Sequence, residues 1–110
     1  MILSIDQVND ILDELCGELP EALFQELNGG VLLLEEALPD RSAGEDVYIM
    51  GEYCCDEMGR YVNIYYGSFA ALLYDEPRQV WVDELRTTLR HELTHHVEGL
   101  AGERSLEYKD

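Results

Sequence analysis

The first third of the chain has the hydrophobic periodicity of helices. Four apolar residues stand at i, i+3, i+4 and i+7 and so share one face of a predicted helix: Val8, Ile11, Leu12 and Leu15. The segment Ser4–Gln7 has the Ser-x-x-Gln form of a capping box, which favours a helix start there, and Gly17 is suited to end that helix. Pro20 suits the first position of a second short helix, and Gly29 and Gly30 end it.

The middle of the chain has the alternation and composition of strands. Apolar residues at every second position of the segment Tyr61–Tyr66 predict a half-buried strand, and the apolar runs Val31–Leu34 and Val47–Met50 predict two more. The segment Asp56–Arg60 is typical of the loop of an antiparallel hairpin. The polar segment Pro39–Asp46 is expected to be a loop that is too short to separate two domains.

A third apolar stripe predicts the longest element. After a short apolar piece, Phe69–Tyr74, the segment Asp75–Pro77 suits a helix start. Helical spacing then relates five residues as far as Gly99: Val82, Leu85, Leu89, Leu93 and Val97. Such a helix has about 20 residues and a length of about 30 Å. We therefore expect one α+β domain over residues 1–110, with N-terminal helices, a small and mostly antiparallel sheet, and a long C-terminal helix.

The strongly acidic net charge of the chain excludes two classes of binding partner, nucleic acid and anionic membranes. The 110 residues include 24 acidic and 7 basic side chains, a formal net charge of -17, and 46% of the residues are hydrophobic, which is enough for one core. The clustered lysine and arginine that bind nucleic acid and anionic membrane surfaces are missing, so we expect neither partner. The acidic surface either keeps a small protein in solution or repels acidic substrates and partners, and the first interpretation is preferred.

The lack of a recognisable targeting signal and the number of cysteines lead us to expect a cytoplasmic protein. The longest apolar run, Phe69–Tyr74, is far shorter than the roughly 20 residues of a membrane-spanning helix, and the N-terminus lacks the basic region of a signal peptide. Three cysteines, of which Cys54 and Cys55 are adjacent, fit a reducing compartment better than a disulfide framework. The adjacent pair lacks the spacing of zinc knuckles, so we expect free thiols that are buried or lie on a strand.

The predicted long helix carries the sequence His-Glu-x-x-His, at His91, Glu92 and His95. Residues four apart lie above one another on a helix, so the two imidazoles converge on one tetrahedral zinc. Zinc lowers the pKa of a bound water to about 7. Glu92 stands beside the first ligand, where its carboxylate can act as general base and then pass the proton to a leaving amine. All three histidines fall within six positions on this helix, which raises the motif above a chance match.

Two neighbours of the motif are expected to serve other purposes than metal binding. Glu98 lies on the same face as His91, but a further turn places it about 5 Å too far along the axis to ligate, so it is expected to cap the helix or support a ligand. His96 points about 100° away from His95 on a helix, and core packing or a hydrogen bond is its expected role.

A catalytic zinc usually has three protein ligands, so the motif needs one more. Gly99 and Gly102 give the chain the means to turn back after the helix. A turn there is expected to fold Glu103 over the metal, which makes Glu103 the first choice for the third ligand. Asp110 is the second choice, and Glu107 is also available.

The C-terminal third and the order of elements resemble a known family, the small bacterial zincin-like metallopeptidases first catalogued as a domain of unknown function. The resemblance rests on the segments His91–His96, Glu98–Arg104 and Leu106–Asp110, and with the predicted helices and strands it covers essentially the whole chain. It implies a minimal zincin fold, a small sheet packed on the active-site helix, with zinc held by the two motif histidines. The position ten after the first histidine is Ala101, so the third ligand of metzincins cannot be carried over.

Three functions are compatible with these features. The first is a cytoplasmic zinc metallopeptidase or related amide hydrolase, whose peptide or protein substrate pairs with a sheet edge. A single domain bounds the cleft on one side only, so either the substrate is a short peptide or a flexible terminus, or a partner or a second copy completes the cleft. The second is a metal-binding or protein-interaction module that keeps the zinc site without hydrolysis. The third is an acidic interaction domain without metal. Tyr61, Tyr65 and Trp81 either form a binding surface or pack in the fold. For Tyr61 and Tyr65, which lie on a predicted strand, packing is the preferred interpretation.

Overall fold

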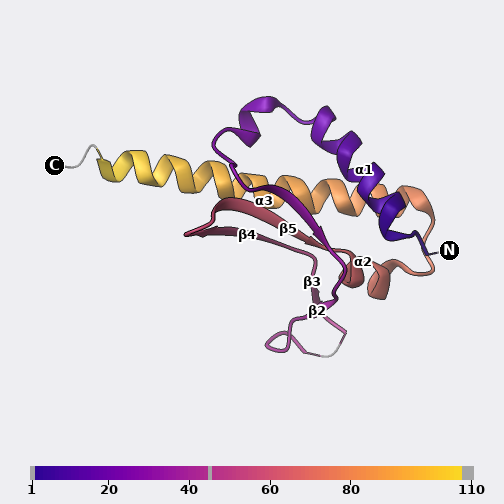
Figure 1. Ribbon diagram of the computed structural model, residues 1–110. Helices are drawn as coiled ribbons and strands as arrows, with labels where there is room; N and C mark the ends of the chain where they lie inside the picture. Colours follow the sequence, from indigo (N-terminus) through magenta and orange to yellow (C-terminus); the bar gives the residue numbers. More distant parts are fainter. Residues whose placement is uncertain (1, 45, 108–110) are drawn as a thin grey trace.

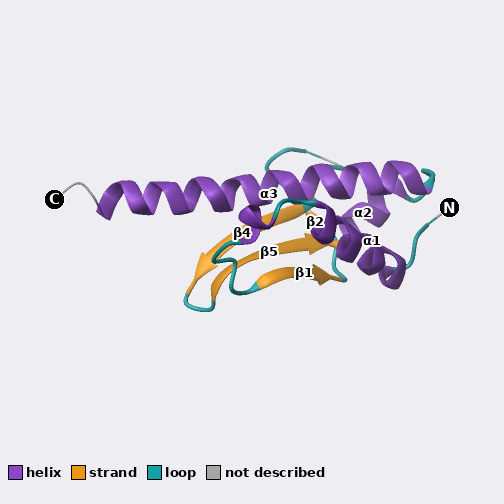
Figure 2. Cartoon of the chain, turned by 90° about the horizontal axis from the view of Figure 1, so that it is seen from above, coloured by secondary structure: helices purple, strands orange, loops and turns teal. Residues whose placement is uncertain are grey.

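The structure is a computed structural model that describes residues 2–44 and 46–107 of the chain. Its α+β architecture confirms the predicted fold class, and α3 runs along the sheet beside β4 (Figures 1 and 2). In chain order the elements are α1 (Ile5–Glu18), the 3-10 helix η1 (Glu21–Phe24), β1 (Gly30–Leu34), β2 (Leu38–Pro39), β3 (Tyr48–Ile49), β4 (Gly51–Asp56), β5 (Gly59–Tyr65), α2 (Tyr66–Leu73) and α3 (Arg78–Glu107).

The main sheet has three strands in the order β1-β5-β4. Strand β1 runs parallel to β5, β4 runs antiparallel to β5, and β2 and β3 form a separate antiparallel pair. Two of the three pairings are thus antiparallel, as expected. The hairpin predicted around Asp56–Arg60 joins β4 to β5. Strand β4 lies at the edge of the sheet nearest to α3 (Figure 2), and this position brings its main chain to the histidine motif.

Helix α1 forms as its sequence predicts. The Ser4 backbone N–H donates to Gln7 Oε1 at 2.8 Å, and the Gln7 backbone N–H donates to Ser4 Oγ at 3.2 Å, which completes the capping box. The predicted apolar stripe is buried, and it packs in the core together with Val62 and Ile64 of β5. Leu85, Leu89 and Leu93 of α3 are fully buried in the same core. The apolar stripe of α3 therefore holds the motif helix against the sheet.

Helix α3 is longer than predicted, and the expected turn at Gly99–Gly102 is wrong. The helix continues through both glycines over 30 residues, to Glu107. A glycine inside a helix costs only about 1 kcal/mol relative to alanine. Leu100 extends the buried stripe by a further turn, and an ion pair between Glu103 and Arg60 of β5 fastens the same stretch. These contacts favour helix where glycine alone suggested a stop.

Three smaller differences concern element type and length. The second helix is a single 3-10 turn, Glu21–Phe24, and the apolar piece after β5 is a helix, Tyr66–Leu73. The strand predicted at Val47–Met50 is shorter, Tyr48–Ile49, and gives way to the longer strand β4.

Trp81 of α3 is fully buried, and its indole N–H donates to the Leu73 carbonyl at 2.9 Å. In the part of the chain that the structure describes, no helix has the length and apolar character needed to cross a membrane.

Replacing Gly99 by alanine tests the continuous helix. A Cβ at this position would meet only Tyr53 Cε2, at an ordinary 3.9 Å. Gly99→Ala is therefore expected to raise the free energy of unfolding by about 0.5–1 kcal/mol, measured by urea denaturation. The control is Gly30→Ala, which is expected to lower it by about 1 kcal/mol because Gly30 has a φ of 72°. A lower stability for Gly99→Ala would mean that the chain turns at this glycine.

Candidate metal centre

His91 and His95 lie one turn apart on the exposed side of α3. Their Nε2 atoms are 3.1 Å apart. The ring centroids are separated by 4.6 Å with the rings nearly perpendicular, at 88°. The i, i+4 spacing thus brings the two ring nitrogens to one point in front of the helix.

This nitrogen pair fits two corners of a zinc site. With Zn–N bonds of about 2.0–2.1 Å, tetrahedral zinc holds two nitrogen ligands about 3.3 Å apart, close to the 3.1 Å between the Nε2 atoms of His91 and His95. Without a metal the same separation is that of an N–H···N hydrogen bond between the rings. Imidazole is also a ligand type that zinc prefers. The two histidines are therefore suited to zinc in both donor type and spacing.

The rest of a three-ligand site is not assembled around this pair. Among the side chains that the structure describes, those of residues 2–44 and 46–103, no group of three or more His, Cys, Asp or Glu is arranged to hold a metal ion. Glu103 is eight residues beyond His95, which is about 12 Å along a helix axis, and its carboxylate pairs with Arg60. The structure does not bring Glu103 to the histidines, because the turn on which that expectation depended is absent from α3.

The other carboxylates considered for the metal lie along or beyond the same helix. Glu98 is exposed, and seven residues of helix separate it from His91 by about 10 Å along the axis. Glu107 is in the last turn of α3, about 18 Å along the axis from His95. Asp110 lies outside the described residues.

Glu92 lies beside the histidine pair on the buried side of α3, and only 8% of its surface is exposed. The backbone N–H of Tyr53 on β4 lies near its carboxylate and favours the charged form. Burial raises the pKa of Glu92 above its ordinary value, while the neighbouring His91 and His95 and the Tyr53 N–H oppose the rise. A higher pKa makes the carboxylate a stronger base than an exposed glutamate.

The outer edge of β4 faces the motif. The Tyr65 N–H donates to the Met50 carbonyl at 3.0 Å. This bond shows that the main-chain groups of Met50, and of every second residue after it along β4, point toward β5. In an antiparallel pair, main-chain groups at alternate residues point away from the neighbour, so those of Gly51, Tyr53 and Cys55 point to the outer edge. A Cβ on Gly51 would lie 2.8 Å from Thr88 Cγ2. Glycine at this position therefore allows β4 to approach α3 one turn before Glu92.

His96 is fully buried and joins three segments of the chain. Its Nε2 lies 2.6 Å from the Gln25 carbonyl oxygen, and its Nδ1 lies 2.9 Å from the Tyr53 hydroxyl oxygen. Since a carbonyl only accepts, Nε2 carries the proton, and in the neutral ring Nδ1 accepts from Tyr53. The expected role of His96, core packing with a hydrogen bond, is confirmed. The contact also fastens β4 to α3 next to Glu92.

Tyr61 and Tyr65 bond to carboxylates of β4 rather than to the histidine pair. The hydroxyl of Tyr61 donates to Asp56 at 2.7 Å, and that of Tyr65 donates to Glu52. Burial and the Glu52 carboxylate raise the pKa of Tyr65 to about 12. Tyr65 is buried, as is Trp81, so packing is their role.

Cys54 and Cys55 are both free thiols on β4, as the sequence analysis expects. Neighbouring residues of a strand point to opposite faces of the sheet. The two thiols therefore do not converge on one point. Cys54 contacts Asn63 of β5, whose Nδ2 lies 3.8 Å from the sulfur atom.

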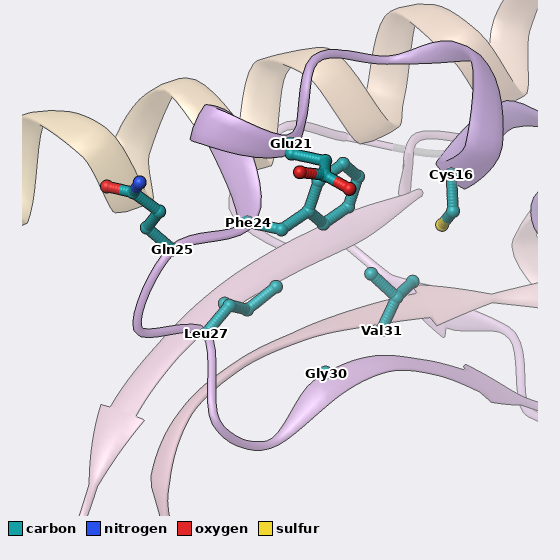
Figure 3. Close-up of a pocket in the computed structure, with 7 residues that line it drawn as sticks. All are labelled: Cys16, Glu21, Phe24, Gln25, Leu27, Gly30 and Val31. Carbon is teal, nitrogen blue, oxygen red and sulfur yellow. The ribbon is translucent and has the colours of Figure 1, made fainter.

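Two cavities differ in their relation to the motif. One of about 580 Å³ lies between the end of α1, η1 and β1 (Figure 3) and has no lining residue on α3 or β4; it is lined by Cys16, Glu21, Phe24, Gln25, Leu27, Gly30 and Val31. Another of about 320 Å³ adjoins the histidine motif directly and includes His91 and Glu92 in its wall. Of these two cavities, only the second has lining residues of the motif.

Three residues of this site were not predicted from the sequence: Gln25, Gly51 and Tyr53. Gln25 and Tyr53 act partly through main-chain atoms, which every residue has, so their side chains give no signal. Gly51 contributes by lacking a side chain. A glycine between two predicted strands is the one available indication, because it often marks a close approach of backbone to another element.

Comparison with known proteins identifies a relative of nearly the same length. No protein-family model and no curated protein matches the chain. Among solved structures the chain is similar to a conserved hypothetical protein from Thermus thermophilus, with 31% sequence identity and a TM-score of 0.77. The match covers 91% of this chain and 99% of the Thermus chain. This chain therefore belongs to the same family as that conserved hypothetical protein.

Proposed function

We propose that this protein is a zinc-dependent metallopeptidase that hydrolyses amide bonds in peptides or proteins. One observation carries the proposal: the Nε2 atoms of His91 and His95 lie 3.1 Å apart beside a buried carboxylate, that of Glu92. Two imidazoles at the spacing of zinc ligands and an adjacent base are the parts that metal-assisted hydrolysis needs. The resemblance of the motif region to zincin-like metallopeptidases agrees with this function.

Each residue of the motif has a separate role in the proposed reaction. His91 and His95 hold the zinc. When bound, zinc polarises the scissile carbonyl and lowers the pKa of water. Glu92 takes the proton from the attacking water and passes it to the leaving amine. The Tyr53 N–H orients the Glu92 carboxylate, and burial keeps that carboxylate away from bulk solvent.

The proposed substrate is an extended chain that adds to the outer edge of β4. Main-chain groups of Gly51 and Cys55 lie on this edge on either side of Tyr53, whose N–H is used by Glu92. Hydrogen bonds along a strand edge give affinity without dependence on side chains. We place this activity in the cytoplasm, where the three free thiols stay reduced.

The third protein ligand is then proposed to be Asp110 or a residue of a second chain, since no third His, Cys, Asp or Glu is grouped with His91 and His95 among the described side chains. In the second case a partner or a second copy also completes the cleft. Zinc content of an Asp110→Ala variant distinguishes the two sources: a loss of zinc assigns the ligand to this residue. If Asp110→Ala keeps the wild-type zinc content, and that content falls when the protein is diluted, the third ligand comes from a second chain.

Metal content of the purified, untagged protein tests the proposal. Mass spectrometry is expected to find one zinc per chain in the wild type and none in the His91→Ala/His95→Ala variant. Arg90→Ala, at an exposed position beside the motif, is the matched control and is expected to keep the metal. No zinc in the wild type, even after incubation with zinc, would overturn the proposal and leave an acidic interaction domain.

A further inference from the structure

The cavity beside the metal centre has the size and wall of a pocket for one side chain. Its volume of about 320 Å³ lies at the lower end of the range for ligand pockets, about 300–1,000 Å³. The wall comes from the β2–β3 hairpin, the start of β4 and one face of α3. The lining residues are Asp40, Tyr48, Ile49, Met50, Gly51, Thr87, Thr88, His91 and Glu92.

The charged side chains in this wall, other than the candidate zinc ligand, are acidic. They are Asp40 and Glu92, and no lysine or arginine belongs to the lining. Ile49 and Met50 give the wall an apolar part, suited to an aliphatic stem. The wall thus combines an apolar surface with a carboxylate at the opposite side from α3.

Asp40 has one carboxylate oxygen without a partner among the described residues. Its Oδ1 accepts from the Ser42 backbone N–H at 3.2 Å and from the Ser42 hydroxyl at 2.7 Å, and these bonds fix the half-buried side chain at the hairpin. Its Oδ2 forms no hydrogen bond or ion pair with the described residues. A fixed carboxylate with a free oxygen in a cavity is a partner for a cation.

We propose that this cavity is the specificity pocket of the site and takes a lysine or arginine side chain of an extended peptide substrate. The inference rests on the proposed peptidase function and adds the class of substrate. The aliphatic stem lies against Ile49 and Met50, and the cationic end pairs with Asp40. The net charge of -17 favours the same peptides, because an acidic surface attracts cationic chains and repels anionic ones.

Peptide binding to a hydrolysis-deficient variant tests the pocket without the need for turnover. The probes are fluorescent octapeptides of alanine and glycine in which one lysine, norleucine or glutamate is moved through each position. Binding to the Glu92→Gln variant is measured by anisotropy, with and without zinc. At one position lysine is expected to bind 10- to 100-fold more tightly than norleucine, as befits a hydrogen bond to a charged group.

Two variants identify the residue responsible. In the Glu92→Gln background, Asp40→Asn keeps an Oδ1 acceptor for Ser42 but removes the charge, and is expected to abolish the preference for lysine while norleucine binding stays unchanged. Asp46→Asn, on the same hairpin but outside the lining of this cavity, is the matched control and is expected to keep the preference. Equal binding of lysine and norleucine, no binding of any peptide, or an unchanged preference in Asp40→Asn would overturn the pocket. The two proposals can also fail separately. If lysine binding depends on Asp40 but the wild-type protein hydrolyses no peptide, the pocket stands and the peptidase function alone is overturned.

Discussion

Replacing Glu92 by glutamine is expected to reduce peptide hydrolysis by about 10²- to 10⁴-fold, the usual contribution of a general acid or base. Glutamine has nearly the same shape and can fill the same buried position, but its amide cannot take a proton from water. The histidines are unchanged, so the variant is expected to keep one zinc per chain. Turnover of a peptide library at pH 7 and zinc content, measured on the same sample, check both parts of the prediction.

The matched control is Glu98→Gln, which removes a carboxylate from an exposed position on the same helix. It is expected to leave turnover within about twofold, because an exposed side chain away from the pair neither holds the metal nor moves the proton. Turnover retained in Glu92→Gln would contradict the assignment of the base. Zinc binding without turnover in any variant, including the wild type, would favour a metal-binding module without hydrolase activity.

The spacing of residues predicted the parts of the site that depend on one helix. The pair His91 and His95 meets at 3.1 Å because both ring nitrogens project from the same face of α3. The apolar stripe that includes Leu85 and Leu89 fixed which side of that helix is buried. Both predictions use only the period of a helix, which acts over a few residues and does not require the rest of the fold.

The third metal ligand could not be predicted from helix periodicity. Glycine favours a helix end only when nothing else holds the helix together. Here burial of Leu100 and the ion pair of Glu103 with Arg60 join α3 to a strand far away in sequence. Such contacts depend on the register of β5 against β4, which no pattern near Gly99 encodes. The contact between Tyr53 and Glu92 could not be predicted for a similar reason, since it uses the main chain of an edge strand, which every residue has.

Replacing His96 by leucine is expected to lower the free energy of unfolding of the zinc-free protein by about 1–3 kcal/mol. Leucine fills a similar volume, so the loss reports mainly on the hydrogen bonds. The Gln25 carbonyl and the Tyr53 hydroxyl each lose the buried His96 as a partner, and a hydrogen bond of this kind contributes about 0.5–1.5 kcal/mol. Urea denaturation of the metal-free protein is the measurement, because bound zinc would add its own stabilisation.

A double-mutant cycle with Tyr53→Phe separates the two hydrogen bonds. Tyr53→Phe alone is expected to cost about 1 kcal/mol, since it removes one bond and leaves His96 held by Gln25. In the double variant no Tyr53 hydroxyl is left unpaired, so the combined cost is expected to be smaller than the sum of the single costs. Additive costs would mean that the two side chains act independently. If the cycle shows coupling, faster hydrogen exchange of the Tyr53 amide in His96→Leu is also expected, because His96 then holds the edge of β4 against Glu92.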